Sequence, residues 1–182
     1  MTEQMTAVEE RLHGPRVVVG IDFSAGARAA LLFGLHDAAR RGVPVEAVSA
    51  YRPPDYWMDF NAVATYQPER IRAAALDRLR SFVAEVVPDG PQPPPEVHVR
   101  AANGTPADVL TLESHDADLL VVGSSGHGGF AHVLLGSVSI QCAQHASCPL
   151  LPTTSRSASC DSRVSTSAAV PIAARRCTSG GG

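Results

Sequence analysis

The sequence contains no lysine, because all 15 of its basic residues are arginine. This excludes mechanisms that need a lysine, such as a Schiff base, a P-loop phosphate site or a kinase-type active site. Charged residues make up only 18% of the chain and the formal net charge is -3, so no overall positive charge attracts nucleic acid or an anionic membrane. We therefore expect small molecules or proteins as partners, and neither nucleic acid nor membrane.

Long hydrophobic runs and metal-binding cysteine spacings are also missing. No apolar run approaches the roughly 18 residues that span a bilayer, and residues 1–11 are acidic, unlike a secretory signal. We therefore expect a cytoplasmic protein. The four cysteines lack a C-x-x-C spacing, which argues against a zinc site or a disulfide framework, so we expect reduced thiols and no metal site; they are Cys142, Cys148, Cys160 and Cys177.

The composition favours one globular domain followed by a tail. The chain has 182 residues, of which 45% are hydrophobic, and a mean hydropathy of +0.02. From Pro152 onward, serine, alanine and arginine dominate and large aliphatic residues are rare, as in disordered segments. The sequence therefore predicts a flexible N-terminus at 1–14, a globular domain at 15–151 and a disordered tail at 152–182.

Strand and helix patterns alternate along the globular domain. Ser24 and Thr105 are suited to cap helices, Gly42 to end one, and Pro68 and Pro106 to occupy first turns. The predicted strands are 16–22, 43–51, 97–101, 118–123 and 149–151, and the predicted helices are 24–41, 68–87, 105–115 and 137–146. This order predicts an α/β fold with a doubly wound, Rossmann-like, mostly parallel sheet of five strands. Its ligand crevice is expected beyond the carboxyl ends of the strands, at the switch point.

Two segments that suit a phosphate ligand follow predicted strands. The first is Gly20–Ser24 and the second is the glycine-rich run Gly123–Gly129, whose backbone amides can form an anion nest without lysine. Gly136 opens the last helix, where free amides and the hydroxyls of Ser137 and Ser139 can bind phosphate oxygens. A mobile connector and an ordinary helix cap would explain the same residues without a ligand.

The spacing of the glycines resembles a known signature. Gly123-x2-Gly126-x9-Gly136-Ser137 matches the G-2x-G-9x-G(S/T) pattern of the universal stress protein family, and the similarity extends over residues 15–151. It includes the VVVGIDFS start, the Gly104-Thr105-Pro106 turn and the Cys148-Pro149 approach to the last strand. The resemblance implies an adenine-nucleotide-binding domain and a single-domain, ATP-binding member.

The resemblance also implies which residues contact ATP. It places Asp22 and Ala50 near the adenine, Gly123 near the ribose, and Gly126, Gly136, Ser137 and Val138 at the phosphates. The candidate site further includes neighbours of these positions at the same strand ends and turns: Gly20, Ser24, Gly104, Ser124, His127 and Gly128. A divalent ion, Mg²⁺ or Mn²⁺, would neutralise the remaining phosphate charge. Asp22 could instead cap a helix or fix a loop, and the pair Tyr56-Trp57 could cover the adenine or anchor a loop.

Three functions remain open at this stage. The resemblance favours an ATP-binding stress-response or regulatory protein. An enzyme sharing this site would be at most a slow ATPase or a nucleotide-processing enzyme, because no general base, second carboxylate or arginine finger can be named near the phosphate loop. A nucleotide-free protein-interaction module is the third possibility.

The last strand departs from the family pattern. Members usually end on an apolar strand and many form homodimers through it, whereas this chain reads CPLLPTTSRSAS. Because Pro152 has no N–H to donate to a sheet, we expect the edge strand to be cut short before it. The homodimer that the resemblance implies should therefore be weakened.

Overall fold

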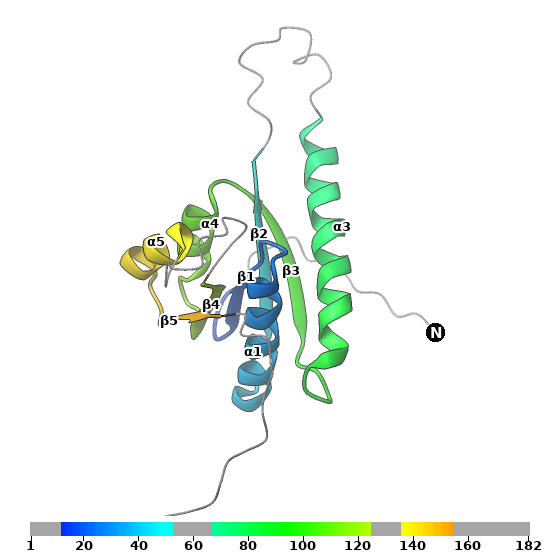
Figure 1. Cartoon of the computed structure of the whole chain (residues 1–182), viewed down its shortest axis with the longest axis vertical. Helices are drawn as coiled ribbons and strands as arrows, with labels where there is room; N and C mark the ends of the chain where they lie inside the picture. The colour runs from blue at the N-terminus through cyan, green and yellow to red at the C-terminus, as the bar shows by residue number, and fades with distance from the viewer. Residues whose placement is uncertain (1–11, 53–66, 125–135, 155–182) are drawn as a thin grey trace, which may run out of the picture.

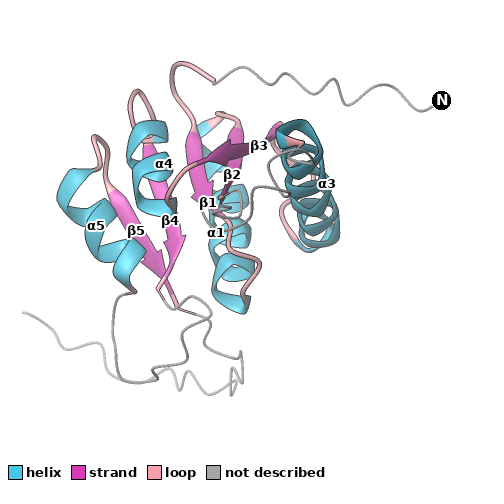
Figure 2. Cartoon of the chain, turned by 90° about the horizontal axis from the view of Figure 1, so that it is seen from above, coloured by secondary structure: helices cyan, strands magenta, loops and turns pink. Residues whose placement is uncertain are grey.

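The computed structural model describes residues 12–52, 67–124 and 136–154, and they form a five-stranded sheet between two pairs of helices (Figures 1 and 2). The strands lie in the order β3-β2-β1-β4-β5, and every neighbouring pair is parallel. Their bounds are β1 Val17–Gly20, β2 Val45–Tyr51, β3 Val97–Asn103, β4 Leu119–Gly123 and β5 Leu150–Thr153. The predicted α/β, doubly wound fold is confirmed.

Two helices cover each face of the sheet. The helices are α1 Ala25–Arg41, α3 Pro68–Val86, α4 Pro106–Glu113 and α5 Ser137–His145, with a 3-10 turn, Val87–Asp89, after α3. Side chains of β1 alternate between the two cores: Val17 and Val19 pack with α1 and α3, and Val18 packs with α4 and α5. All three valines are fully buried, which explains the continuous apolar run of this strand.

Local sequence signals set the helix ends. The backbone N–H of Ala27 donates to Ser24 Oγ at 3.1 Å, and that of Asp108 donates to Thr105 Oγ1 at 3.2 Å. Gly42 ends α1 with a φ of 70°, a left-handed conformation that favours glycine. These predicted caps are confirmed, and the element bounds agree with the predictions to within about two residues.

The expectation that Pro152 ends the last strand early is wrong. β5 continues to Thr153, and Pro152 lies opposite Val122 of β4. The N–H groups of Leu120 and Ser124 donate to the carbonyls of Pro149 and Thr153, so the odd-numbered residues of β5 face β4. Residue 152 therefore faces the open edge, where a missing N–H costs the sheet no hydrogen bond.

The first residues of the predicted tail, Pro152 and Thr153, thus belong to the sheet. Residues 1–11 and 155–182, which hold most of the predicted flexible N-terminus and disordered tail, lie outside the described residues. Within the described ranges, no helix has the length and apolar character required to cross a membrane.

A buried ionic cluster, which the sequence did not predict, lies beside α4. The Arg16 guanidinium donates to Glu46 Oε2 at 2.6 Å and to the Glu113 carbonyl at 2.9 Å. Arg100 Nε lies 2.9 Å from Glu113 Oε1. Arg16, Glu46 and Glu113 are each 1% exposed, and with Arg100 the cluster holds two positive and two negative groups.

Candidate functional site

The expected crevice lies where the chain switches direction across the sheet, between β1 and β4. β1 is followed by α1 toward β2, whereas β4 is followed by α5 toward β5 on the other side. The carboxyl ends of β1 and β4 and the N-termini of α1 and α5 therefore meet at one edge of the sheet. The described site residues that gather here are Gly20, Asp22, Ser24, Gly123, Ser124, Gly136, Ser137 and Val138.

The turn between β1 and α1 uses its polar side chains as caps. The Ser24 backbone N–H donates to Asp22 Oδ1 at 3.0 Å, and Ser24 Oγ accepts from Ala27 at the start of α1. Phe23, with a φ of 64°, packs edge-on against Phe82 of α3. Asp22 therefore fixes the loop, as the alternative interpretation proposed, while its side chain remains exposed at the edge of the crevice.

Glycine is required at the end of β4 for close packing against α1. A Cβ on Gly123 would lie 2.9 Å from the carbonyl carbon of Gly26 and 3.2 Å from the backbone nitrogen of Ala27. Thr153 Oγ1 donates to the carbonyls of Gly26 and Val122 at 3.4 and 3.3 Å. The ends of β4 and β5 are thereby held against the first turn of α1.

The start of α5 is anchored to β4 through main-chain contacts. The Gly136 N–H donates to the Ser124 carbonyl at 2.7 Å, and a Cβ on Gly136 would lie 3.3 Å from that carbonyl oxygen. Ser124 is buried, and its own N–H donates to Thr153. Gly136 thus allows the helix to begin directly above the end of β4.

The first turn of α5 has no side-chain cap. Its first helical hydrogen bond joins the Ile140 N–H to the Gly136 carbonyl at 3.0 Å. The N–H groups of Ser137, Val138 and Ser139 precede that bond and have no acceptor among the described residues. Ser137 is exposed, so this helix end presents amides, the positive end of the helix dipole and one hydroxyl.

The assignment of the Ser139 hydroxyl to a phosphate is wrong. Ser139 is 1% exposed, and its Oγ donates to the Gly123 carbonyl at 3.2 Å. The side chain of the third helical residue turns back toward the sheet and ties α5 to β4. Its role is to position the helix end, and only its backbone N–H remains available to a ligand.

The remaining candidates are more dispersed. Gly20 faces Leu110 of α4, whose Cδ1 would lie 2.8 Å from an added Cβ. Ala50 lies near the end of β2, next to β1, whereas Gly104 follows β3 and is separated from β1 by β2. Gly104 has a φ of 149° and donates its N–H to the Tyr51 carbonyl at 3.0 Å. Other predicted residues lie outside the described ranges: Gly126, His127, Gly128 and the Tyr56-Trp57 pair.

Among residues 12–52, 67–124 and 136–154, no group of three or more His, Cys, Asp or Glu side chains is placed to hold a metal ion. A cavity of about 290 Å³ lies elsewhere, along β3 between α3 and α4. The sequence did not predict this cavity, because no motif marks it.

The family model and the curated relatives that match this chain agree on one family. The family model described as "Universal stress protein family" matches residues 15–152. A universal stress protein of Mycolicibacterium smegmatis is 36% identical over 141 residues, which cover 74% of this chain and 44% of the relative. A universal stress protein of Mycobacterium tuberculosis is 32% identical over 139 residues, which cover 74% of this chain and 46% of the relative. The chain thus spans less than half the length of these curated relatives.

Solved structures show the same fold. The universal stress protein UspA from Lactobacillus plantarum superposes with a TM-score of 0.61 at 21% identity, covering 78% of this chain and 99% of that one. A universal stress protein in complex with cAMP superposes with a TM-score of 0.52 at 24% identity. The superposition covers 78% of this chain and 97% of that one.

Proposed function

Because the chain belongs to the universal stress protein family, we propose that it binds ATP in the crevice between β1 and β4. In this proposal the protein is a cytoplasmic, nucleotide-dependent stress-response or regulatory protein, and nucleotide occupancy changes its conformation or its choice of partner. Mg²⁺ or Mn²⁺ would accompany the nucleotide and neutralise part of the phosphate charge.

The observation that carries the proposal is the uncapped N-terminus of α5. The amides of Ser137, Val138 and Ser139 have no acceptor within the described part of the chain, and a helix end of this kind can bind an anion without lysine. The Gly136 N–H and the Ser139 hydroxyl hold the start of α5 against the end of β4, so contacts within the protein set the position of these amides. A solved universal stress protein of this fold carries cAMP, which supports an adenine nucleotide as the ligand class.

Each side of the crevice would have its own task. The Ser137 hydroxyl and the amides of the first turn of α5 would donate hydrogen bonds to phosphate oxygens. Asp22, exposed beside β1, would face the nucleoside end, next to Ala50 of β2. Gly126, His127 and Gly128 would complete the phosphate contacts from their place in the glycine signature.

The sharpest test changes the charge of the helix end without disturbing its fold. We expect Ser137→Asp to weaken ATP-Mg binding at least about tenfold, because an added carboxylate repels phosphate. An aspartate in the first turn of a helix interacts favourably with the helix dipole, so the melting temperature of the variant should stay the same or rise. Calorimetric titration with millimolar ATP-Mg and a thermal melt measure both quantities.

Ser137→Ala is the matched control, because it removes one hydroxyl and adds no charge. It should weaken binding only about fivefold, the cost of one hydrogen bond. Saturable binding that Ser137→Asp leaves unchanged would place the phosphates elsewhere. A protein that gives no heat and no thermal shift with any adenine nucleotide would contradict the proposal and favour an interaction module.

A further inference from the structure

The turn between β1 and α1 has an unusual backbone at Phe23. Its φ of 64° lies in the left-handed region, which bulky side chains adopt rarely. Phe23 is the middle residue of a turn that the Asp22 carboxylate closes, because Asp22 Oδ1 accepts the Ser24 N–H at 3.0 Å. The conformation of Phe23 therefore sets where the Asp22 carboxylate lies relative to the start of α1.

Contacts with α3 hold the Phe23 side chain. Its ring is nearly perpendicular to the ring of Phe82, with 5.6 Å between the centroids, and the guanidinium carbon of Arg78 lies 3.9 Å from the Phe23 ring centroid. Both arrangements are favourable for aromatic rings. Arg78 and Phe82 are four residues apart, so they lie on the same side of α3. Phe23 and Phe82 are half-buried and pack against the core on this face of the sheet.

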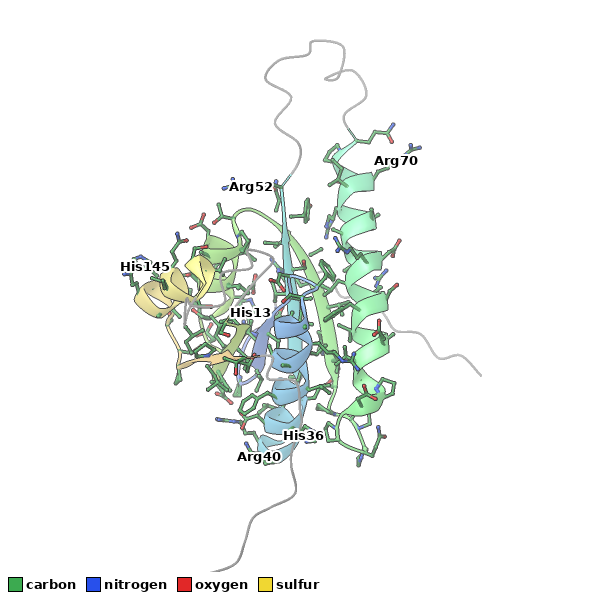
Figure 3. All side chains as sticks on the ribbon, viewed as in Figure 1. His13, His36, Arg40, Arg52, Arg70 and His145 are labelled. Atoms are coloured by element: carbon green, nitrogen blue, oxygen red, sulfur yellow. The ribbon has the colours of Figure 1, made fainter. Side chains whose placement is uncertain are left out.

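The lengths of the strands place the middle of α3 beside this turn. β1 ends at Gly20, whereas the neighbouring β2 continues beyond it to Tyr51. In Figure 3, Arg52 after β2 and Arg70 in the first turn of α3 mark the same end of the molecule, and α1 and α3 both run away from that end. The first turns of α3 therefore lie beyond the end of β1, and later turns meet the start of α1.

Ion pairs between α1 and α3 hold the helix rather than the turn. Arg28, near the start of α1, pairs with Glu85 of α3 at 3.5 Å and with Asp89 in the 3-10 turn that follows. The side chains of Glu85 and Asp89 are 76% and 57% exposed, so water screens both pairs. Phe23 is thus the residue through which α3 contacts the turn itself.

We infer that Phe23 is a positioning residue for the nucleotide site proposed above, on which this inference rests. Contacts with Phe82 and Arg78 stabilise the left-handed conformation of Phe23, and that conformation presents Asp22 Oδ2 to the nucleoside. Asp22 is exposed, and its Oδ2 has no partner among the described residues. Through Asp22, α3 contributes to the affinity for the nucleotide.

Two substitutions of Phe23 separate backbone conformation from packing. Valine is apolar but β-branched and disfavours a positive φ, whereas asparagine is polar and adopts a positive φ more readily. Calorimetric titration should show ATP-Mg binding weakened about tenfold by Phe23→Val and only about threefold by Phe23→Asn. A role in packing alone gives the reverse order, because valine keeps the apolar contact. Thermal melts verify that each variant is folded at the titration temperature.

A double-mutant cycle tests whether Phe23 acts through Asp22. Asp22→Ala should weaken ATP-Mg binding about tenfold. Adding Phe23→Val to it should cost less than about a further twofold, because the group that Phe23 positions is then gone. Ser137→Ala, on the other side of the crevice, is the matched control, and its cost should add in full to that of Phe23→Val.

Arg78→Gln tests the anchor on α3 with little risk to the fold, because Arg78 is exposed. It removes the cation from the Phe23 ring and should weaken ATP-Mg binding about threefold. Amide exchange followed by NMR should show the Ser24 N–H of the nucleotide-free variant exchanging about threefold faster. Arg80→Gln, on the same helix but paired with Asp77, is the control and should change neither quantity.

The outcomes distinguish this inference from the nucleotide proposal. A wild-type protein that binds no adenine nucleotide would overturn both. If the wild type binds ATP-Mg, three results would each overturn the role of Phe23 alone. These are a Phe23→Val variant that binds at least as tightly as Phe23→Asn, fully additive costs of Phe23→Val and Asp22→Ala, or an Arg78→Gln variant with the ATP affinity and Ser24 exchange of the wild type.

Discussion

At the scale of single residues, Asp37 shows how a buried carboxylate is stabilised on a helix. Its side chain is 6% exposed and lies 2.6 Å from Arg40 and 2.5 Å from Arg41, one turn further along α1. Burial by itself would raise the pKa of Asp37, but the hydrogen bonds and charges of the two arginines outweigh it and lower the pKa below its ordinary value of 3.8.

This lowered pKa predicts a pH dependence of stability. A carboxyl whose folded pKa is depressed stabilises the protein above its unfolded pKa, and this contribution disappears as the pH falls through the folded value. We expect Asp37→Asn to lower the free energy of unfolding by about 1 kcal/mol at pH 7. The difference from the wild type should shrink below about pH 4, as urea titrations at several pH values will show.

Asp77→Asn is the control, because Asp77 lies on the exposed side of α3 with its own arginine partner, Arg80. Its effect on the free energy of unfolding should be smaller, because an exposed ion pair contributes little. A constant difference for Asp37→Asn from pH 7 to pH 3 would mean that the arginines do not stabilise the ionised form.

At the scale of an element, β5 shows that the direction of a backbone group matters more than residue type. Pro152 sits inside the strand because its nitrogen faces the open edge, whereas the nitrogens of Leu151 and Thr153 face β4. The same proline one position earlier would remove a hydrogen bond of the ladder.

The alternation predicts opposite effects at adjacent positions. Pro152→Val should change the free energy of unfolding by less than about 1 kcal/mol, since no hydrogen bond within the sheet depends on residue 152. Leu151→Pro should destabilise the protein by about 2 kcal/mol, because it removes a donor that faces β4 and leaves its acceptor unpaired. Chemical denaturation compares the two variants directly, and equal costs would refute the pairing inferred for this strand.

At the scale of the whole molecule, the sheet has two open edges among the described residues, β3 and β5. The homodimer that the family resemblance implies would use β5, and it stays a prediction. Pro152 places a residue without an N–H at that edge, which weakens any strand pairing with a second copy.

We expect the wild-type protein to associate only weakly and Pro152→Val to associate at least about threefold more tightly, because valine restores an outward donor. Sedimentation velocity over a range of protein concentrations measures both constants. Arg72→Gln, at the opposite edge, is the control and should leave self-association unchanged. A tight dimer in the wild type that Pro152→Val does not alter would show that β5 is not the contact.

The sequence by itself determined the order of strands and helices, the caps at Ser24 and Thr105, and the place of the candidate site at the ends of β1 and β4. These features depend on hydrophobic periodicity and on turn and capping residues, which act over a few neighbours along the chain. The spacing of the glycines indicated the family, and the family resemblance in turn indicated ATP as the ligand to test.

Only the tertiary structure decided which groups face which neighbours. Ser139 turns toward Gly123 rather than toward a ligand, Pro152 faces outward, and Arg16 meets Glu46 and Glu113 inside the molecule. Each of these outcomes depends on contacts between segments far apart in the sequence, and local patterns carry no record of such contacts.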